Sequence, residues 1–113
     1  MKTGWIRLAR FAICTVAVLA LGLTSVPAGA QDAAALYKTK CAACHGADGK
    51  GETAIGKANK IRDLGSAEVQ AESDADLTTI ITAGKGKMPA YGKSLKPEQV
   101  KDLVAYIRTL AKK

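Results

Sequence analysis

The pentapeptide Cys41-Ala42-Ala43-Cys44-His45 constrains the fold of this chain more than any other feature of its sequence. Three common uses of a cysteine pair do not fit it. A thioredoxin-like pair needs alternating strands and helices around it, and a structural zinc site needs four ligands. A plain disulfide has no need of the neighbouring histidine. Beyond residue 30 the chain has no third cysteine and no second histidine, so the count of ligands excludes the zinc site.

The same spacing suits covalent attachment of a haem. Two thiols separated by two residues reach the two vinyl groups of one haem, and the histidine that follows is carried beneath the iron as an axial ligand. We therefore expect Cys41 and Cys44 to bind haem c, and His45 to bind its iron.

Met88 is the strongest candidate for the second axial ligand. It is the only methionine besides the initiator, and it lies in the glycine-rich segment 84–92. Pro89 favours an extended backbone at Met88, while the glycines let the loop bend and project a side chain. A methionine that only fills a core would be expected on an apolar helical stripe. Lys85 or Lys87 is the alternative ligand.

Histidine and methionine together close both faces of the iron and raise its reduction potential. A closed iron exchanges electrons and binds little else, so this ligand pair predicts a one-electron carrier rather than an enzyme. The alternative is a peroxidase or a sensor with an open iron, which would require Met88 to be bound weakly or not at all.

Residues 1–30 have the three parts of a secretory signal peptide. A basic start, Met1–Arg10, precedes an apolar run, Phe11–Thr24, and Ala28-Gly29-Ala30 forms a small-residue cleavage site. We expect cleavage after Ala30, which would leave residues 31–113 as a soluble, monomeric, periplasmic domain without stable membrane insertion. The alternative is an uncleaved anchor that tethers a haem subunit to a membrane oxidoreductase. The apolar run, at about 14 residues, is shorter than the roughly 20 needed to span a bilayer.

Hydrophobic periodicity predicts an all-α domain of about four helices. In the clearest of them Pro97 occupies the first helical position, and the apolar residues that follow recur along one stripe. The segment 46–60 is rich in glycine and reads as a loop. The four expected helices are 32–40, 66–70 after Ser66, 73–84 between Ser73 and Gly84, and 97–112.

This order of helices around the Cys41–His45 motif and Met88-Pro89 resembles the class I cytochrome c family, and most closely its small bacterial electron carriers. The resemblance covers residues 31–113. It implies about four helices wrapped around one covalently attached haem, with redox proteins as donor and acceptor. Tyr37 matches the aromatic residue of the family's first helix, and Leu103 and Tyr106 match the pair that crosses it from the last helix.

One departure from the family concerns the histidine. Many members have a proline after the haem motif whose carbonyl accepts the second N–H of the ligand histidine, but this chain has no proline between Pro27 and Pro89. A ligating histidine normally needs such an acceptor. We expect a carbonyl from residues 60–63 to replace it at His45.

Basic residues exceed acidic ones by 17 to 10. Haem propionates would reduce the excess, so nothing supports nucleic-acid binding. Lysines flank the segment that holds Met88, which predicts a docking surface for an acidic partner, although a basic rim that serves only solubility is the alternative. The residues in question are Lys85, Lys87 and Lys93 for docking, and Lys57, Lys60 and Arg62 as propionate partners or solvated loop charges.

Overall fold

The computed structural model describes residues 22–112, and the regular secondary structure of this part of the chain consists of helices joined by loops. Its only β-type pairing is an isolated bridge between Lys85 and Met88, so the predicted all-α class is confirmed. The helices are α1 (Ala28–Lys40), α2 (Ala42–His45), α3 (Ala54–Ala58), α4 (Ala67–Gln70), α5 (Asp74–Ala83) and α6 (Pro97–Thr109).

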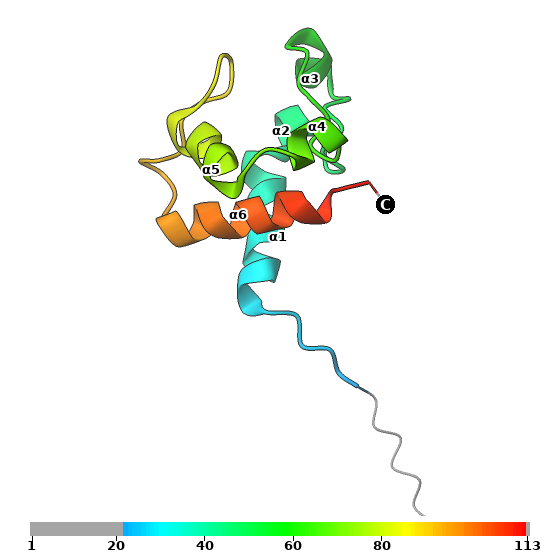
Figure 1. Ribbon diagram of the computed structural model, residues 1–113, viewed down its shortest axis with the longest axis vertical. Helices are drawn as coiled ribbons and strands as arrows, with labels where there is room; N and C mark the ends of the chain where they lie inside the picture. The colour runs from blue at the N-terminus through cyan, green and yellow to red at the C-terminus, as the bar shows by residue number, and fades with distance from the viewer. Residues whose placement is uncertain (1–21, 113) are drawn as a thin grey trace, which may run out of the picture.

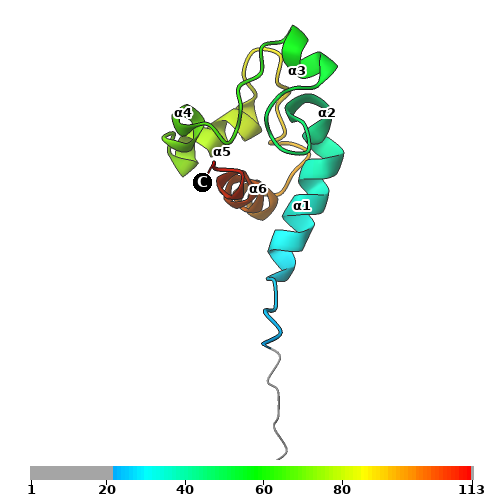
Figure 2. The same cartoon turned by 90° about the vertical axis from the view of Figure 1, so that its right-hand side faces the viewer.

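Helices α1 and α6 cross, and the other elements gather on one side of this crossing (Figures 1 and 2). Tyr37 of α1 is 2% exposed, and its ring centroid lies 4.9 Å from that of Tyr106 of α6. Leu103 is buried beside them in the same core. The predicted contact between the first and last helices is therefore confirmed.

The boundaries of α4, α5 and α6 follow from their capping residues. Ser66 and Ser73 each accept a backbone N–H of the first turn that follows them. Asp76 completes a capping box with Ser73, and Gly84 ends α5 at φ +75°. Helix α6 starts at Pro97 as predicted but ends at Thr109, three residues before the predicted end.

The prediction that 46–60 is only a loop is wrong, because α3 lies within it. The Thr53 hydroxyl caps α3 by accepting the N–H of Gly56 at 2.8 Å, and it donates to the carbonyl of Cys44 at 2.7 Å. A single turn of helix holds too few residues to produce a hydrophobic period. Its stability here comes from the contact with the segment that carries the two cysteines.

The first helix also starts earlier than predicted. It begins at Ala28 after Pro27, not at Asp32, so the expected cleavage site after Ala30 lies in its first turn. Residues 1–21, which include most of the predicted signal peptide, lie outside the described part of the chain.

Candidate functional site

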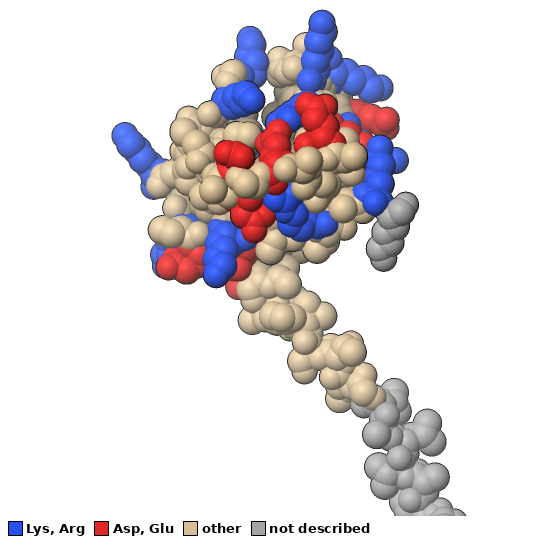
Figure 3. Space-filling model, viewed as in Figure 1, with Lys and Arg blue, Asp and Glu red and all other residues tan. Residues whose placement is uncertain are grey.

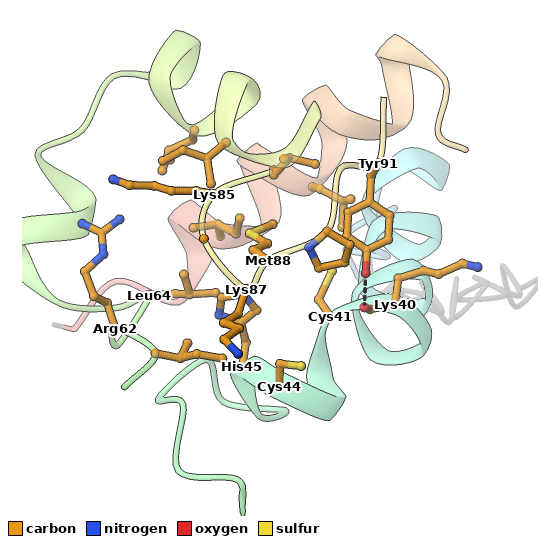
Figure 4. Close-up of a pocket in the computed structure, with 18 of the residues that line it drawn as sticks. Lys40, Cys41, Cys44, His45, Arg62, Leu64, Lys85, Lys87, Met88 and Tyr91 are labelled. Atoms are coloured by element: carbon orange, nitrogen blue, oxygen red, sulfur yellow. Dashed lines mark hydrogen bonds between the residues drawn. The ribbon is translucent and has the colours of Figure 1, made fainter. Parts of the chain in front are cut away.

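A cavity of about 430 Å³ lies between the cysteine motif and the loop 84–92, which is the first part of the connection from α5 to α6 (Figure 4). In Figure 1 this loop and α3 both rise on the same side of α6, the loop at the left of the view and α3 at the right. The floor and walls are largely apolar, and several of the residues that form them also belong to the buried core. These shared residues are Tyr37, Val69, Leu77, Ile81, Leu95, Leu103 and Ile107.

The two cysteines lie on one side of this cavity, at the junction of α1 and α2. The backbone N–H groups of Cys44 and His45 both donate to the carbonyl of Cys41, at 3.2 and 3.0 Å. This turn brings both thiols and the imidazole to the cavity lining. Burial, followed by the proximity of Cys44, raises the pKa of the Cys41 thiol to about 11. Both sulfurs are free and half-buried.

His45 presents a ring nitrogen with no partner. Its Nδ1 is buried and makes no hydrogen bond within the described chain, so the expected acceptor from residues 60–63 is not found. The backbone at this position is fixed, because the carbonyl of His45 accepts the N–H of Gly51 at 2.7 Å. Burial lowers the pKa of His45, which favours the neutral imidazole, the form that binds metals.

Met88 reaches the same cavity from the loop 84–92 (Figure 4). It is half-buried and packs against the core. Lys85 and Met88 exchange two backbone hydrogen bonds, of 3.2 and 2.9 Å, which shape the tip of the loop. A Cβ on Gly84 would lie 2.6 Å from the carbonyl oxygen of Met88, so the loop can close only on a glycine. The four residues predicted from the sequence thus line one cavity.

Basic side chains project from the end of the molecule that carries α3 and the loop 84–92 (Figure 3). Of the predicted basic residues, Lys60, Arg62, Lys85 and Lys87 line the cavity, whereas Lys57 and Lys93 do not. Arg62 is not simply solvated, because its guanidinium pairs with Glu72 and Glu68. The hydrogen bond to Glu72 is the main reason that the pKa of Arg62 is raised.

One polar contact of this cavity could not be predicted from the sequence. The Tyr91 hydroxyl donates to the carbonyl of Lys40 at 3.1 Å, and both residues line the cavity. Tyr91 lies only three residues after the candidate ligand Met88, and this position could have indicated that it contributes to the cavity. Its partner lies 51 residues away in the chain, and spacing alone does not reveal such a contact.

The donor set fits a haem. Two thiols one turn apart, a neutral imidazole with an unpaired buried nitrogen and a thioether all line one apolar cavity. Imidazole and thioether are ligands of low-spin haem iron.

Residues 28–107 match the family model described as cytochrome C oxidase, cbb3-type, subunit III. A cytochrome c6 from Gloeothece citriformis is 33% identical over 105 residues, which cover 87% of this chain and 90% of that protein. The cbb3-type cytochrome c oxidase subunit FixP of Azorhizobium caulinodans is 34% identical over 82 residues. That match covers 72% of this chain but only 27% of FixP, so the chain spans about a quarter of the length of this relative.

Among solved structures, the KustC0563 c-type cytochrome is similar, with a TM-score of 0.67 and 35% identity. The superposition covers 71% of this chain and 98% of that one. Within residues 22–112, no helix has both the length and the apolar character needed to cross a membrane.

Proposed function

The chain belongs to the class I cytochrome c family, in which haem c is bound covalently and carries electrons between redox proteins, and we propose that this member is a soluble periplasmic carrier. In this proposal Cys41 and Cys44 hold the haem, and His45 and Met88 are the axial ligands of its iron. The supporting observation is that all four side chains line one cavity.

The protein residues would set the conditions for electron exchange. Bound haem supplies an iron that changes oxidation state by one electron. The thioether of Met88 is a soft donor that favours the reduced state, and the buried leucine and isoleucine side chains keep water away from the ligands. If His45 and Met88 both held the iron, no position on it would be left for a substrate.

The rim of the cavity supports docking to an acidic partner. Lys60, Lys85 and Lys87 are exposed at the cavity lining, and a positive rim speeds encounter with a negative surface. Reversal of charge by Lys87→Glu should slow electron transfer to an acidic partner at low salt and have little effect at high salt. Unchanged rates at low salt would mean that the rim serves solubility only.

A second candidate is a haem subunit attached to a membrane oxidase through its N-terminal segment. Two observations favour it. Some relatives are cbb3-type oxidase subunits, and α1 already begins at Ala28. A Cβ on Gly29 would lie 3.2 Å from the Asp102 carboxylate of α6, so cleavage after Ala30 would remove a helical turn that lies against α6.

The mass of the protein recovered from cells separates these two candidates. A carrier processed after Ala30 begins at Gln31 and appears in the periplasmic fraction. An anchored subunit keeps residues 1–30 and stays with membranes after a high-salt wash.

The ligand assignment is tested by absorption spectra of the exported protein, oxidised and reduced. We expect a low-spin c-type spectrum with the weak far-red band of ferric iron bound to methionine sulfur. Met88→Ala should abolish that band and allow cyanide to bind readily. A high-spin spectrum in the wild-type protein would instead favour the open iron of a peroxidase or sensor.

A further inference from the structure

The backbone of the loop 84–92 is hydrogen-bonded mainly to α5, the helix that precedes it. The backbone N–H of Tyr91 donates to the carbonyl of Ile81 at 2.9 Å, and that of Gly92 donates to the carbonyl of Thr82 at 3.0 Å. The paired bonds between Lys85 and Met88 lie within the loop itself. These bonds define the shape of the loop, but they do not connect it to the other side of the cavity.

One side chain makes that connection. The Tyr91 hydroxyl donates to the carbonyl of Lys40 (Figure 4), and Lys40 is both the last residue of α1 and the residue before Cys41. Within residues 22–112 this is the only hydrogen bond between the loop and the segment formed by α1 and α2. It therefore joins the part of the chain that carries Met88 to the part that carries the cysteines.

The Tyr91 ring is suited to this contact. It is half-buried and packs against the core, so packing restrains the orientation of the ring that carries the hydroxyl. Burial also raises the pKa of Tyr91, and the phenol stays protonated as a donor at neutral pH.

We propose that Tyr91 is a positioning residue whose hydroxyl holds the loop 84–92 closed against the end of α1, so that Met88 stays on the iron. This inference rests on the proposed ligation by Met88. Without the hydroxyl, the loop keeps its bonds to α5 but opens more often on the side of the cysteines. A neutral hydrogen bond of this kind corresponds to a change of roughly two- to tenfold in an equilibrium constant.

The test compares Tyr91→Phe with Tyr106→Phe in the haem-loaded protein. Tyr106 is a matched control, because its ring packs on Tyr37 and its hydroxyl has no hydrogen-bond partner in the described chain. The probe is imidazole, which binds ferric iron only when Met88 leaves. We expect Tyr91→Phe to bind imidazole about fivefold more tightly than the wild type, and Tyr106→Phe to match the wild type. Equal affinities in the two variants would overturn the proposal.

A thermal melt distinguishes positioning from general destabilisation. In Tyr91→Phe the far-red band should disappear at a lower temperature than in the wild type, while the helical signal in circular dichroism melts almost where it did before. If the band and the helical signal shift together, Tyr91 acts through overall stability and the proposal is wrong. A wild type that lacks the band would instead refute the ligation by Met88 on which the proposal rests.

Discussion

Gly56 of α3 occupies a place that no side chain could share. A Cβ there would collide with the carbonyl oxygen of Gly51 and would lie 2.7 Å from that of Cys44. Both are backbone atoms, which cannot move aside as a flexible side chain would. The close approach holds α3 against the turn that carries the two cysteines.

Gly56→Ala should therefore lower the free energy of unfolding of the haem-loaded protein by about 3 kcal/mol. Gly86→Ala is the control, since a methyl there meets no atom within 4 Å and carries only the strain of φ +57°, which costs about 1 kcal/mol. Denaturant melts followed by circular dichroism measure both. Equal losses would show that the close contact at Gly56 is unimportant.

At the scale of residues, the sequence permits prediction where the chemistry is local. The haem-binding and ligand candidates rest on spacing within five residues for Cys41–His45, and on one methionine before a proline for Met88. The roles of Gly56 and Tyr91 depend on contacts with segments that are distant in sequence or become close only on folding. The prediction that a carbonyl of residues 60–63 accepts a hydrogen bond from His45 was wrong for the same reason. The direction in which such a carbonyl points depends on tertiary structure.

At the scale of elements, capping chemistry predicted α4, α5 and the start of α6 correctly. Serine precedes α4 and α5, glycine follows α5, and proline begins α6, so the sequence marks these boundaries. Helices α2 and α3 were missed because each is a single turn, stabilised by neighbouring segments rather than by its own pattern. The start of α1 was predicted too late because the small residues Ala28–Ala30 are typical of a signal-peptide cleavage site as well as compatible with a helix.

The capping box of α5 provides a test at this scale. Ser73→Ala removes the side chain that accepts the N–H of Asp76 at 3.1 Å, and it should cost about 1 kcal/mol in the free energy of unfolding. Ser73→Thr keeps a hydroxyl at the same place and should recover most of the loss. If the two variants melt alike, the cap does not contribute to stability.

For the whole molecule, the central cavity implies that the folded chain depends on its haem. The cavity is lined by Leu77, Ile81 and Leu103, which belong to the core. Leaving so large an apolar volume unfilled would remove packing energy comparable to the whole stability of a small domain, about 5–15 kcal/mol.

A chain with both Cys41→Ala and Cys44→Ala should consequently lose most of its helical signal in circular dichroism at room temperature. The haem-loaded wild type serves as the reference. A cooperative melt from a fully helical state in the double variant would contradict the prediction.

An ion pair attaches the C-terminal segment to the loop that precedes α4 and makes the stability of the fold depend on pH. The ammonium of Lys112 lies 2.7 Å from the Asp63 carboxylate, and the backbone N–H of Lys112 donates to the carbonyl of Gly65. The hydrogen bond from Lys112 is the main cause of the lowered pKa of Asp63, and a bond from the N–H of Gly65 adds to it. Conversely, Asp63 raises the pKa of Lys112.

Because the folded state lowers the pKa of Asp63, its contribution to stability is present above the ordinary value of 3.8 and is lost as pH falls through the lowered one. The contribution of Lys112 is lost only at alkaline pH, above 10.5. Asp63→Asn should thus melt below the wild type at pH 7, by an amount that shrinks with added salt and vanishes in strong acid. Asp32→Asn, an exposed carboxylate with no ion-pair partner in the described residues, is the control. A difference that persists unchanged in acid would exclude the ion pair as its cause.

The direction of α1 determines how this cytochrome can be mounted on a surface. The helix carries Cys41 next to one end and residues 22–27 at the other, about 20 Å away (Figure 1). A protein fixed to an electrode through the N-terminal end of α1 would therefore turn the lysine rim toward the solution and remain accessible to a diffusing redox protein. A protein fixed through Lys87 would turn the lysine rim toward the electrode surface and exchange electrons with the electrode directly.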